Sequence, residues 1–535
     1  MRSRPRSRNS PAPARDRGGA AGQGGAFIRL TKRQQTMPLS APERIELAPG
    51  LEISRIVTGL WQVADMERGG RALDLDAAAA DLARYAEAGF DTFDMADHYG
   101  SAEDIAGRFN ALIAAGKVAR LNRGGAVALT KWCPTPGAMT KDVVRAAVGR
   151  SLARLQASRI DLMQLHWWSF EHPAYIDAVG ELAAMQDEGL INHLGVTNFD
   201  TDHLRVLVKQ GVRVASNQVS FSLLDRRAGE DMTAFCLAND IKLLTYGTLA
   251  GGFLSEKWLD RPEPAAVGIT DWSKSKYRRF IDQIGGWDVF QAILRAAASV
   301  AEKHRVSIAN IATRWVLDQP AVAAVIVGAR LGESEHRADN LRAFDFSLDD
   351  DDRRLLAAAL ARARRIPGDC GDEYRRPPYL TASGDLSHHL ENVPPFYQAV
   401  PSPGRPARLR VDSGSVWEAA CGYSRAVRVG DRILVSGTTA THWNGDVVCK
   451  GDPHGQTVYI LDKIAASVRA LGGTLEDVVR TRIYVRDAAK WEPVARVHGR
   501  YFGGTRPANT LVEISDLVGD YDVEIEAEAL LDGST

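Results

Sequence analysis

Short hydrophobic runs rich in β-branched residues alternate with longer amphipathic stretches from about residue 51 to about residue 346. The short runs predict strands, and apolar spacings of three and four positions in the longer stretches predict helices. Such alternation is typical of a parallel sheet, and eight strands is the number that closes a (β/α)8 barrel. The predicted strands are residues 56–61, 91–96, 126–131, 160–166, 191–197, 214–221, 241–249 and 323–328.

An open, doubly wound sheet is the alternative arrangement for this pattern. That fold commonly carries a glycine-rich phosphate-binding turn after its first strand. No such turn follows the first predicted strand here. The favoured fold class is therefore α/β, with a TIM barrel over residues 41–360.

A second alternating pattern covers residues 416–535 and predicts a small α+β domain. Its two helices, expected at 457–471 and 491–501, would pack on one face of a sheet. Residues 361–415 are rich in Arg, Pro and Gly, which predicts a linker or wrapping segment between the domains. The predicted strands of the second domain are residues 426–429, 433–436, 478–485, 509–514 and 523–530.

The first 40 residues are predicted to form a disordered basic arm. Residues 1–36 contain nine Arg or Lys against one acidic residue, Asp16, with Pro, Ser and Gly between them. Such a composition cannot bury a core. It is compatible with an organelle transit peptide and equally with a start codon assigned too early, because Met37 opens a sequence of ordinary composition.

The overall composition narrows the class of protein. A length of 535 residues favours more than one domain, and 45% hydrophobic with 25% charged residues is typical of soluble globular chains. No run is long enough to span a membrane, and a net charge of -1 gives no field that favours nucleic acid. The five cysteines form no C-x-x-C pair, so neither a disulfide framework nor a metal site is predicted, and a cytoplasmic location is expected.

Polar residues cluster where three barrel strands are predicted to end. Asp94 and Tyr99 follow one strand, Lys131 ends the next, and His166 ends a third. The active sites of TIM barrels lie at the carboxyl ends of the strands. Each residue alone suits an ordinary role as a cap, a rim aromatic, a surface charge or a buried imidazole. Together at neighbouring strand ends they indicate a catalytic site.

These residues belong to motifs that resemble the aldo-keto reductases over about residues 45–351. The motifs are Phe-Asp-Met-Ala-Asp-His-Tyr-Gly at 93–100, Thr-Lys-Trp at 130–132, residues 161–166, and Gly-Val-Thr-Asn-Phe at 195–199. The resemblance implies reversible reduction of an aldehyde or ketone with a nicotinamide dinucleotide. Tyr99 would be the proton donor, Lys131 would lower its pKa, Asp94 would hold Lys131, and His166 would orient the carbonyl oxygen.

The same resemblance implies where the cofactor binds. Thr197, Asn198 and Gln218 match positions that hydrogen-bond the nicotinamide carboxamide, and Tyr246 matches the aromatic residue that stacks on its ring, unless it is simply a core residue. Gly328, Arg330 and Asn340 lie in a segment similar to the adenosine-phosphate loop. Because a guanidinium can bind a 2'-phosphate through two hydrogen bonds, NADPH is favoured over NADH.

Several tryptophans flank the predicted strand ends. Trp61, Trp132 and Trp167 could wall an aromatic pocket for a small carbonyl substrate, or they could be core residues. The sequence leaves both interpretations open.

The C-terminal pattern resembles the RidA (YjgF-like) family over about residues 416–531. The matching motifs include residues 422–427, 435–437, 506–508 and 523–527. The resemblance implies a trimer with sites between subunits that hydrolyse imines and enamines, with Tyr423, Asn509 and Glu524 at the site. Asn509 stands where the family has an arginine for the substrate carboxylate, and an amide cannot replace that charged, bidentate contact. Three roles stay open: a binding or trimerisation module, hydrolysis of an uncharged substrate, and ordinary deamination.

The function expected from the sequence is NADPH-dependent reduction of a carbonyl by the barrel, in a homotrimer assembled through the RidA-like domain. The alternative is a regulatory protein that senses the cofactor with the same scaffold.

Overall fold

The computed structural model describes residues 41–63, 73–118, 126–265, 269, 272–332, 335–375 and 395–531. The predicted basic arm over residues 1–40 and residues 376–394 of the predicted linker lie outside the described residues. Among the helices that are described, none is both long and apolar enough to cross a bilayer.

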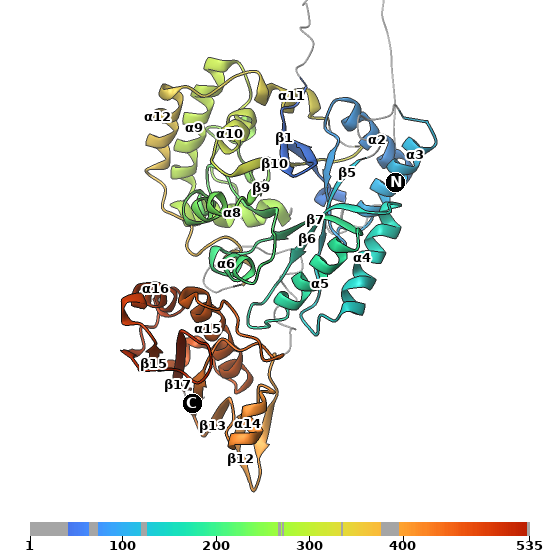
Figure 1. Ribbon diagram of the computed structural model, residues 1–535. Helices are drawn as coiled ribbons and strands as arrows, with labels where there is room; N and C mark the ends of the chain where they lie inside the picture. The colour runs from blue at the N-terminus through green and yellow to red at the C-terminus, as the bar shows by residue number, and fades with distance from the viewer. Residues whose placement is uncertain are drawn as a thin grey trace, which may run out of the picture. The chain divides into compact units, whose positions relative to one another are not determined.

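Eight parallel strands close into a barrel, as predicted (Figure 1). Strands β3 to β10 follow one another around it, and the last strand pairs with the first. The TIM barrel is therefore confirmed. Its strands are β3 (Ile56–Gly59), β4 (Thr92–Asp94), β5 (Val127–Trp132), β6 (Ile160–His166), β7 (Ile191–Thr197), β8 (Ser216–Ser220), β9 (Lys242–Tyr246) and β10 (Val322–Gly328).

Helices cover the outside of the barrel, with α4 and α5 side by side in Figure 1. Many begin at a side chain that accepts hydrogen bonds from the first turn, as Asp74, Thr140 and Asp200 do. The helices are α2 (Leu75–Glu87), α3 (Ala102–Ala114), α4 (Lys141–Leu155), α5 (Tyr175–Asp187), α6 (Thr201–Lys209), α7 (Asp231–Ala238), α8 (Trp272–Ile284), α9 (Trp287–His304), α10 (Ile308–Leu317), α11 (Arg337–Leu341) and α12 (Asp350–Leu360).

An antiparallel hairpin of β1 (Arg44–Ala48) and β2 (Leu51–Ser54) packs on the amino-terminal end of the barrel. Its buried Leu47 and Ile53 join one apolar cluster with Val57 and Leu129 of the barrel strands. Because this cluster closes one end, a ligand must enter from the carboxyl ends of the strands.

The C-terminal domain contains a mixed seven-stranded sheet in the order β11-β12-β13-β14-β17-β15-β16. Together with its helices, this sheet confirms the predicted α+β fold. Helix α15 (Pro453–Ala470) packs on β14 and β17 and also contacts α16 (Trp491–Phe502). Side chains of β17 alternate between buried apolar positions and partly exposed Glu524, Glu526 and Glu528, so one sheet face is left uncovered by α15. The strands are β11 (Ala399–Ser402), β12 (Arg405–Val411), β13 (Ala426–Val429), β14 (Arg432–Thr438), β15 (Val478–Val485), β16 (Ala508–Glu513) and β17 (Val523–Leu530).

The segment predicted as a linker, residues 361–415, contains regular structure. Strands β11 and β12 belong to the C-terminal sheet, and a short helix, α13 (Asp372–Arg375), packs against the barrel. Prolines such as Pro401 favoured the linker interpretation, yet Pro401 lies in the edge strand β11, where a missing N–H is tolerated. The C-terminal sheet therefore includes strands that precede residue 416.

Candidate active site

The four predicted catalytic residues meet at the carboxyl end of the barrel. Asp94 ends β4, Lys131 lies near the end of β5, His166 ends β6, and Tyr99 lies between β4 and α3. The Nζ atom of Lys131 is 2.7 Å from Oδ1 and 2.8 Å from Oδ2 of Asp94. It is also 4.8 Å from the centroid of the Tyr99 ring. The ammonium therefore lies between a carboxylate and a phenol.

This ion pair is buried, since Lys131 is 1% and Asp94 is 4% exposed. Burial lowers the pKa of Lys131, and the adjacent Asp94 carboxylate opposes that shift. Gln218 adds a hydrogen bond from its Nε2 atom to Asp94 Oδ1 at 2.7 Å. The carboxylate is thus fixed from two strands, which holds the ammonium beside Tyr99.

His166 is buried, and its imidazole faces the same space. Burial, followed by the nearby charges of Arg375 and His98, holds the pKa of His166 well below its usual value. The ring is therefore neutral at neutral pH and carries one N–H. Its Nε2 atom is 3.3 Å from Nδ2 of Asn198, and the ring packs on Trp168 with 4.2 Å between centroids.

A cavity of about 440 Å³ contains these groups and continues along the barrel mouth. Trp61 forms part of its wall, with its ring centroid 4.9 Å from that of Tyr99. Every residue predicted to catalyse or to bind cofactor lines this one cavity. They are Asp94, Tyr99, Lys131, His166, Thr197, Asn198, Gln218, Tyr246, Gly328, Arg330 and Asn340.

Trp132 and Trp167 do not line the cavity, contrary to the prediction for the substrate pocket. Neighbouring residues of a strand point to opposite faces, so directing Lys131 inward turns Trp132 outward into the core. Trp167, next to His166, is fully buried, and its indole N–H donates to the carbonyl oxygens of Ser169 and His172.

The C-terminal domain does not bring its three predicted site residues together within one chain. Asn509 lies on β16 and Glu524 on β17, with β15 between the two strands, and Tyr423 lies in the turn before β13. Asn509 Nδ2 donates to Thr481 Oγ1 at 2.9 Å. Burial raises the pKa of Glu524, and its carboxylate comes so close to Gly437 that a Cβ there would collide with it.

Arg506 does not occupy the place of the family's arginine. It precedes β16 in a left-handed conformation with φ of 51°, and its Nε donates to the carbonyl oxygen of Gly503 at 3.3 Å. Its side chain is exposed. Arg506 therefore does not place its guanidinium at Asn509.

Comparison with known families decides the classification of the barrel. The model of the aldo/keto reductase family matches residues 55–361, more than half of the chain. The chain belongs to the aldo/keto reductase family. A second family model, Endoribonuclease L-PSP, matches residues 414–531, so this aldo/keto reductase carries a fused RidA-like domain.

Individual relatives cover either domain of this aldo/keto reductase. Pyridoxal reductase from Arabidopsis thaliana chloroplasts is 25% identical over 60% of this chain and 87% of its own length. An NADH-specific methylglyoxal reductase of Escherichia coli is 26% identical over 42% of this chain and 67% of its own. A RutC family protein of Pyrococcus horikoshii is 34% identical over 20% of this chain and 85% of its own.

Members of the aldo/keto reductase family typically use NAD(P)H, and the cavity residues of this chain fit such a group. The Oγ1 atom of Thr197 and the Oε1 atom of Gln62 are buried without a hydrogen-bond partner, so both can serve a polar ligand. A Cβ on Gly328 would lie 2.4 Å from Gln62 Oε1, and one on Gly247 would lie 2.3 Å from the hydroxyl oxygen of Tyr277. Glycine at these two places lets the side chains of Gln62 and Tyr277 lie directly against the backbone at the cavity wall.

Sequence reasoning missed several polar residues of the cavity, among them His98, Lys276 and Tyr374. Tyr374 was missed because it lies in the segment predicted as a linker. Lys276 Nζ is 2.5 Å from the Tyr374 hydroxyl, which is 3.2 Å from the hydroxyl of Tyr246. The only sequence signal was an aromatic residue among charged ones, Asp-Glu-Tyr-Arg at 372–375, within an otherwise Pro- and Arg-rich stretch.

Proposed function

We propose that the barrel catalyses reversible, NADPH-dependent reduction of an aldehyde or ketone to an alcohol. The observation that carries this proposal is the gathering of Tyr99, the Lys131–Asp94 pair and His166 in one cavity with the predicted cofactor residues. A protein that only senses cofactor has no need of an ammonium beside a phenol at that place. The test is consumption of NADPH at 340 nm by the full chain with a panel of aldehydes and ketones. Binding of cofactor without turnover of any of them would favour the sensor.

The cofactor is proposed to bind along the cavity from Asn198 to Asn340. When bound, NADPH supplies a hydride to the carbonyl carbon. Thr197, Asn198 and Gln218 would hold its carboxamide, since amide and hydroxyl groups can donate and accept. Tyr246 would stack on the nicotinamide ring, and Arg330 would bind the 2'-phosphate.

Tyr99 is the proposed proton donor to the carbonyl oxygen. A phenol with a pKa of about 10 is a weak acid at neutral pH, and a nearby cation lowers that value. Lys131 provides that cation, and Asp94 with Gln218 keeps it in place. His166, neutral because it is buried, can donate one N–H to the same oxygen and orient it.

The substrate class follows from the cavity wall and from the relatives. Trp61 beside Tyr99 and Tyr374 beside His166 present aromatic surface to the cavity, which suits a planar or apolar carbonyl compound. Two relatives carry the names pyridoxal reductase and methylglyoxal reductase. The panel should therefore include pyridoxal, methylglyoxal and benzaldehyde.

The RidA-like domain is proposed to act as a binding and trimerisation module. The Asn509 side chain is an uncharged amide that donates to Thr481, so it offers no charge to a substrate carboxylate. Hydrolysis of an uncharged imine is the second candidate, because Glu524 keeps a raised pKa suited to moving a proton. Release of ammonia from imines with and without a carboxylate, compared between the wild type and Glu524→Gln, separates these two roles.

A further inference from the structure

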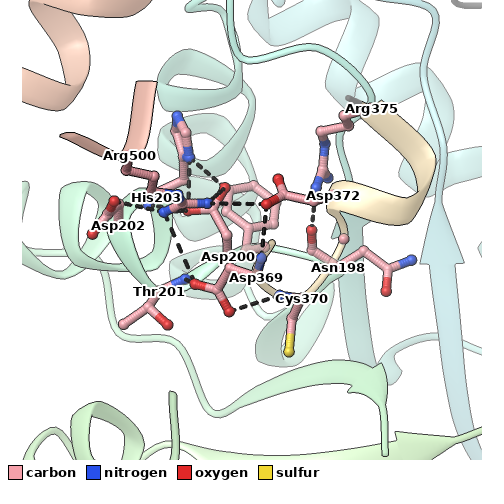
Figure 2. Close-up of polar contacts among 12 residues, drawn as sticks. Asn198, Asp200, Thr201, Asp202, His203, Asp369, Cys370, Asp372, Arg375 and Arg500 are labelled. Carbon is pink, nitrogen blue, oxygen red and sulfur yellow. Dashed lines mark hydrogen bonds and ion pairs between the residues drawn. The ribbon is translucent and has the colours of Figure 1, made fainter. Parts of the chain in front are cut away.

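Arg500, on α16 of the RidA-like domain, reaches a cluster of four carboxylates, two at the start of the barrel helix α6 and two in the segment that follows the barrel (Figure 2). Its Nη1 atom is 2.5 Å from Asp202 Oδ2 and 3.2 Å from Asp200 Oδ1, at the amino terminus of α6. The same guanidinium is 3.9 Å from Asp369 Oδ2 and 3.7 Å from Asp372 Oδ2. One side chain of the second domain therefore joins α6 to the segment that follows the barrel.

Residues 369–375, here called the strap, are tied to α6 at their first end. Asp369 Oδ2 accepts a hydrogen bond from the backbone N–H of Thr201 at 2.9 Å. Asp372 Oδ2 accepts one from the backbone N–H of Asp369 at 2.7 Å. The two strap carboxylates that face Arg500 therefore have a second role. Asp369 ties the strap to α6, and Asp372 fixes the backbone within the strap.

The other end of the strap forms part of the proposed carbonyl site. The Tyr374 hydroxyl is within hydrogen-bond distance of both Lys276 and Tyr246. Arg375 donates from Nη1 to the backbone oxygen of Asn198 and from Nη2 to that of Trp167, each at 2.6 Å. The strap therefore contacts two of the residues proposed to hold the nicotinamide, Asn198 and Tyr246.

Electrostatics make the strap dependent on Arg500. Four carboxylates near one another repel, and burial raises the pKa of Asp369. Within the barrel, His203 offsets part of this charge by contacting Asp200, while His454 of the second domain contacts Asp202. Burial opposes the charge of Arg500, but the carboxylates outweigh it and hold the pKa of Arg500 well above its usual value. Arg500 is within ion-pair distance of both strap carboxylates.

We propose that Arg500 is a positioning residue for the carbonyl site: by holding Asp369 and Asp372 it sets the strap, and the strap sets Tyr374, Tyr246 and Asn198. This inference rests on the proposed reductase function. According to this inference, the RidA-like domain positions residues of the barrel's carbonyl site, whether or not that domain has an activity of its own.

The decisive variant is Arg500→Gln in the full chain, with Arg496→Gln as the matched control. Arg496 lies on the same helix, is largely exposed and pairs with Glu492. Loss of hydrogen bonds to charged groups changes binding roughly tenfold to a hundredfold. We expect Arg500→Gln to raise the KM for the carbonyl compound about tenfold with a smaller change in kcat, Arg496→Gln to match the wild type, and Arg500→Lys to restore part of the loss.

Amide hydrogen exchange of the strap separates this inference from the reductase proposal. In Arg500→Gln, exchange in residues 369–375 should become faster, and the control should leave it unchanged. Asp372→Asn weakens the contact with Arg500 from the strap side and should have the same effect if Arg500→Gln does not fold. If the wild type reduces no carbonyl, the reductase proposal fails while strap exchange still decides the role of Arg500.

The inference would be overturned if a folded Arg500→Gln protein showed the same amide exchange in the strap and the same KM as the wild type. A lower Tm in that variant would not rescue the inference, because it would show only that Arg500 joins the two domains. A double variant with Tyr374→Phe adds a second check. If Arg500 acts through the strap, its effect on KM should shrink in the Tyr374→Phe background.

Discussion

Lys131 Nζ lies 2.7 Å from Asp94 Oδ1 and 4.8 Å from the centre of the Tyr99 ring, so one buried ammonium serves a carboxylate and a phenol together. In the proposed reaction the phenol must give up a proton at neutral pH. The ammonium makes that possible by stabilising the phenolate, and the carboxylate keeps the ammonium charged despite its burial.

Replacing Lys131 by Met should therefore slow carbonyl reduction by a factor of about 10² to 10⁴, the usual contribution of a positioned acid. The remaining activity should vary little between pH 5 and 9, because an unassisted phenol with a pKa near 10 stays protonated over that interval, whereas the wild type should lose activity as the pH rises through its lowered pKa. Steady-state rates across pH 5 to 9 provide the measurement. A variant with wild-type kcat and an unchanged pH profile would remove Lys131 from this role.

His203 should make the stability of the full chain depend on pH. Burial disfavours its charge, but contacts of 2.7 Å to Asp200 Oδ2 and 2.8 Å to Asp462 Oδ2 outweigh burial and raise its pKa to about 9. The stabilisation is complete below the ordinary pKa of about 6.5 and is lost as the pH rises through about 9. It amounts to about 3 kcal/mol.

Urea unfolding of the wild type and of His203→Gln at pH 6, 7.5 and 9.5 checks this prediction. The wild type should lose stability over that interval, and the difference between the two proteins should shrink with rising pH. A difference that stays constant from pH 6 to 9.5 would show that His203 is not protonated in the folded state.

Arg330 should set the cofactor preference, since its guanidinium lines the end of the cavity where Asn340 also lies. Arg330→Ala should raise the KM for NADPH about tenfold to a hundredfold and leave the KM for NADH nearly unchanged. The ratio of kcat/KM for the two cofactors is the measurement. If Arg330→Ala lowers kcat/KM equally with NADPH and with NADH, Arg330 binds a phosphate that both cofactors carry and not the 2'-phosphate.

The uncovered sheet face of the RidA-like domain should mediate trimerisation, as its family resemblance implies. Leu434 on β14 is 41% exposed there, while its neighbours Ile433 and Val435 are buried. The full chain should sediment at three times its 58.2 kDa mass, and Leu434→Arg should lower that mass. Val518→Arg, at a position that is 92% exposed, is the control. A wild-type monomer at micromolar concentration would contradict the trimer.

The barrel could be predicted from sequence because most of its strands are short runs rich in apolar and β-branched residues with clear ends. β6 and β7 have the predicted limits, Ile160–His166 and Ile191–Thr197. β9 ends at Tyr246, three residues before its predicted end, because Gly247 turns the chain with φ of 72°. The pattern of neighbouring residues predicts such strands because the residues within each strand specify where it begins and ends.

The strap could not be predicted in this way. Asp369, Asp372 and Tyr374 owe their places to Thr201, Arg500 and Lys276, residues far away in the chain. The spacing of hydrophobic and polar residues along the chain does not predict contacts between residues so far apart in the sequence. The outward direction of Trp132, in contrast, was available from the alternation of β5, given that Lys131 points inward.

The central claim is that Tyr99 is the proton donor, and single-turnover reduction by the full-length Tyr99→Phe variant tests it most directly. With a carbonyl compound that the wild type reduces, loss of NADPH at 340 nm should be at least about 10² slower in the variant, while the affinity for NADPH, measured by its fluorescence, stays within about twofold. A variant that reduces the compound at the wild-type rate would contradict the account.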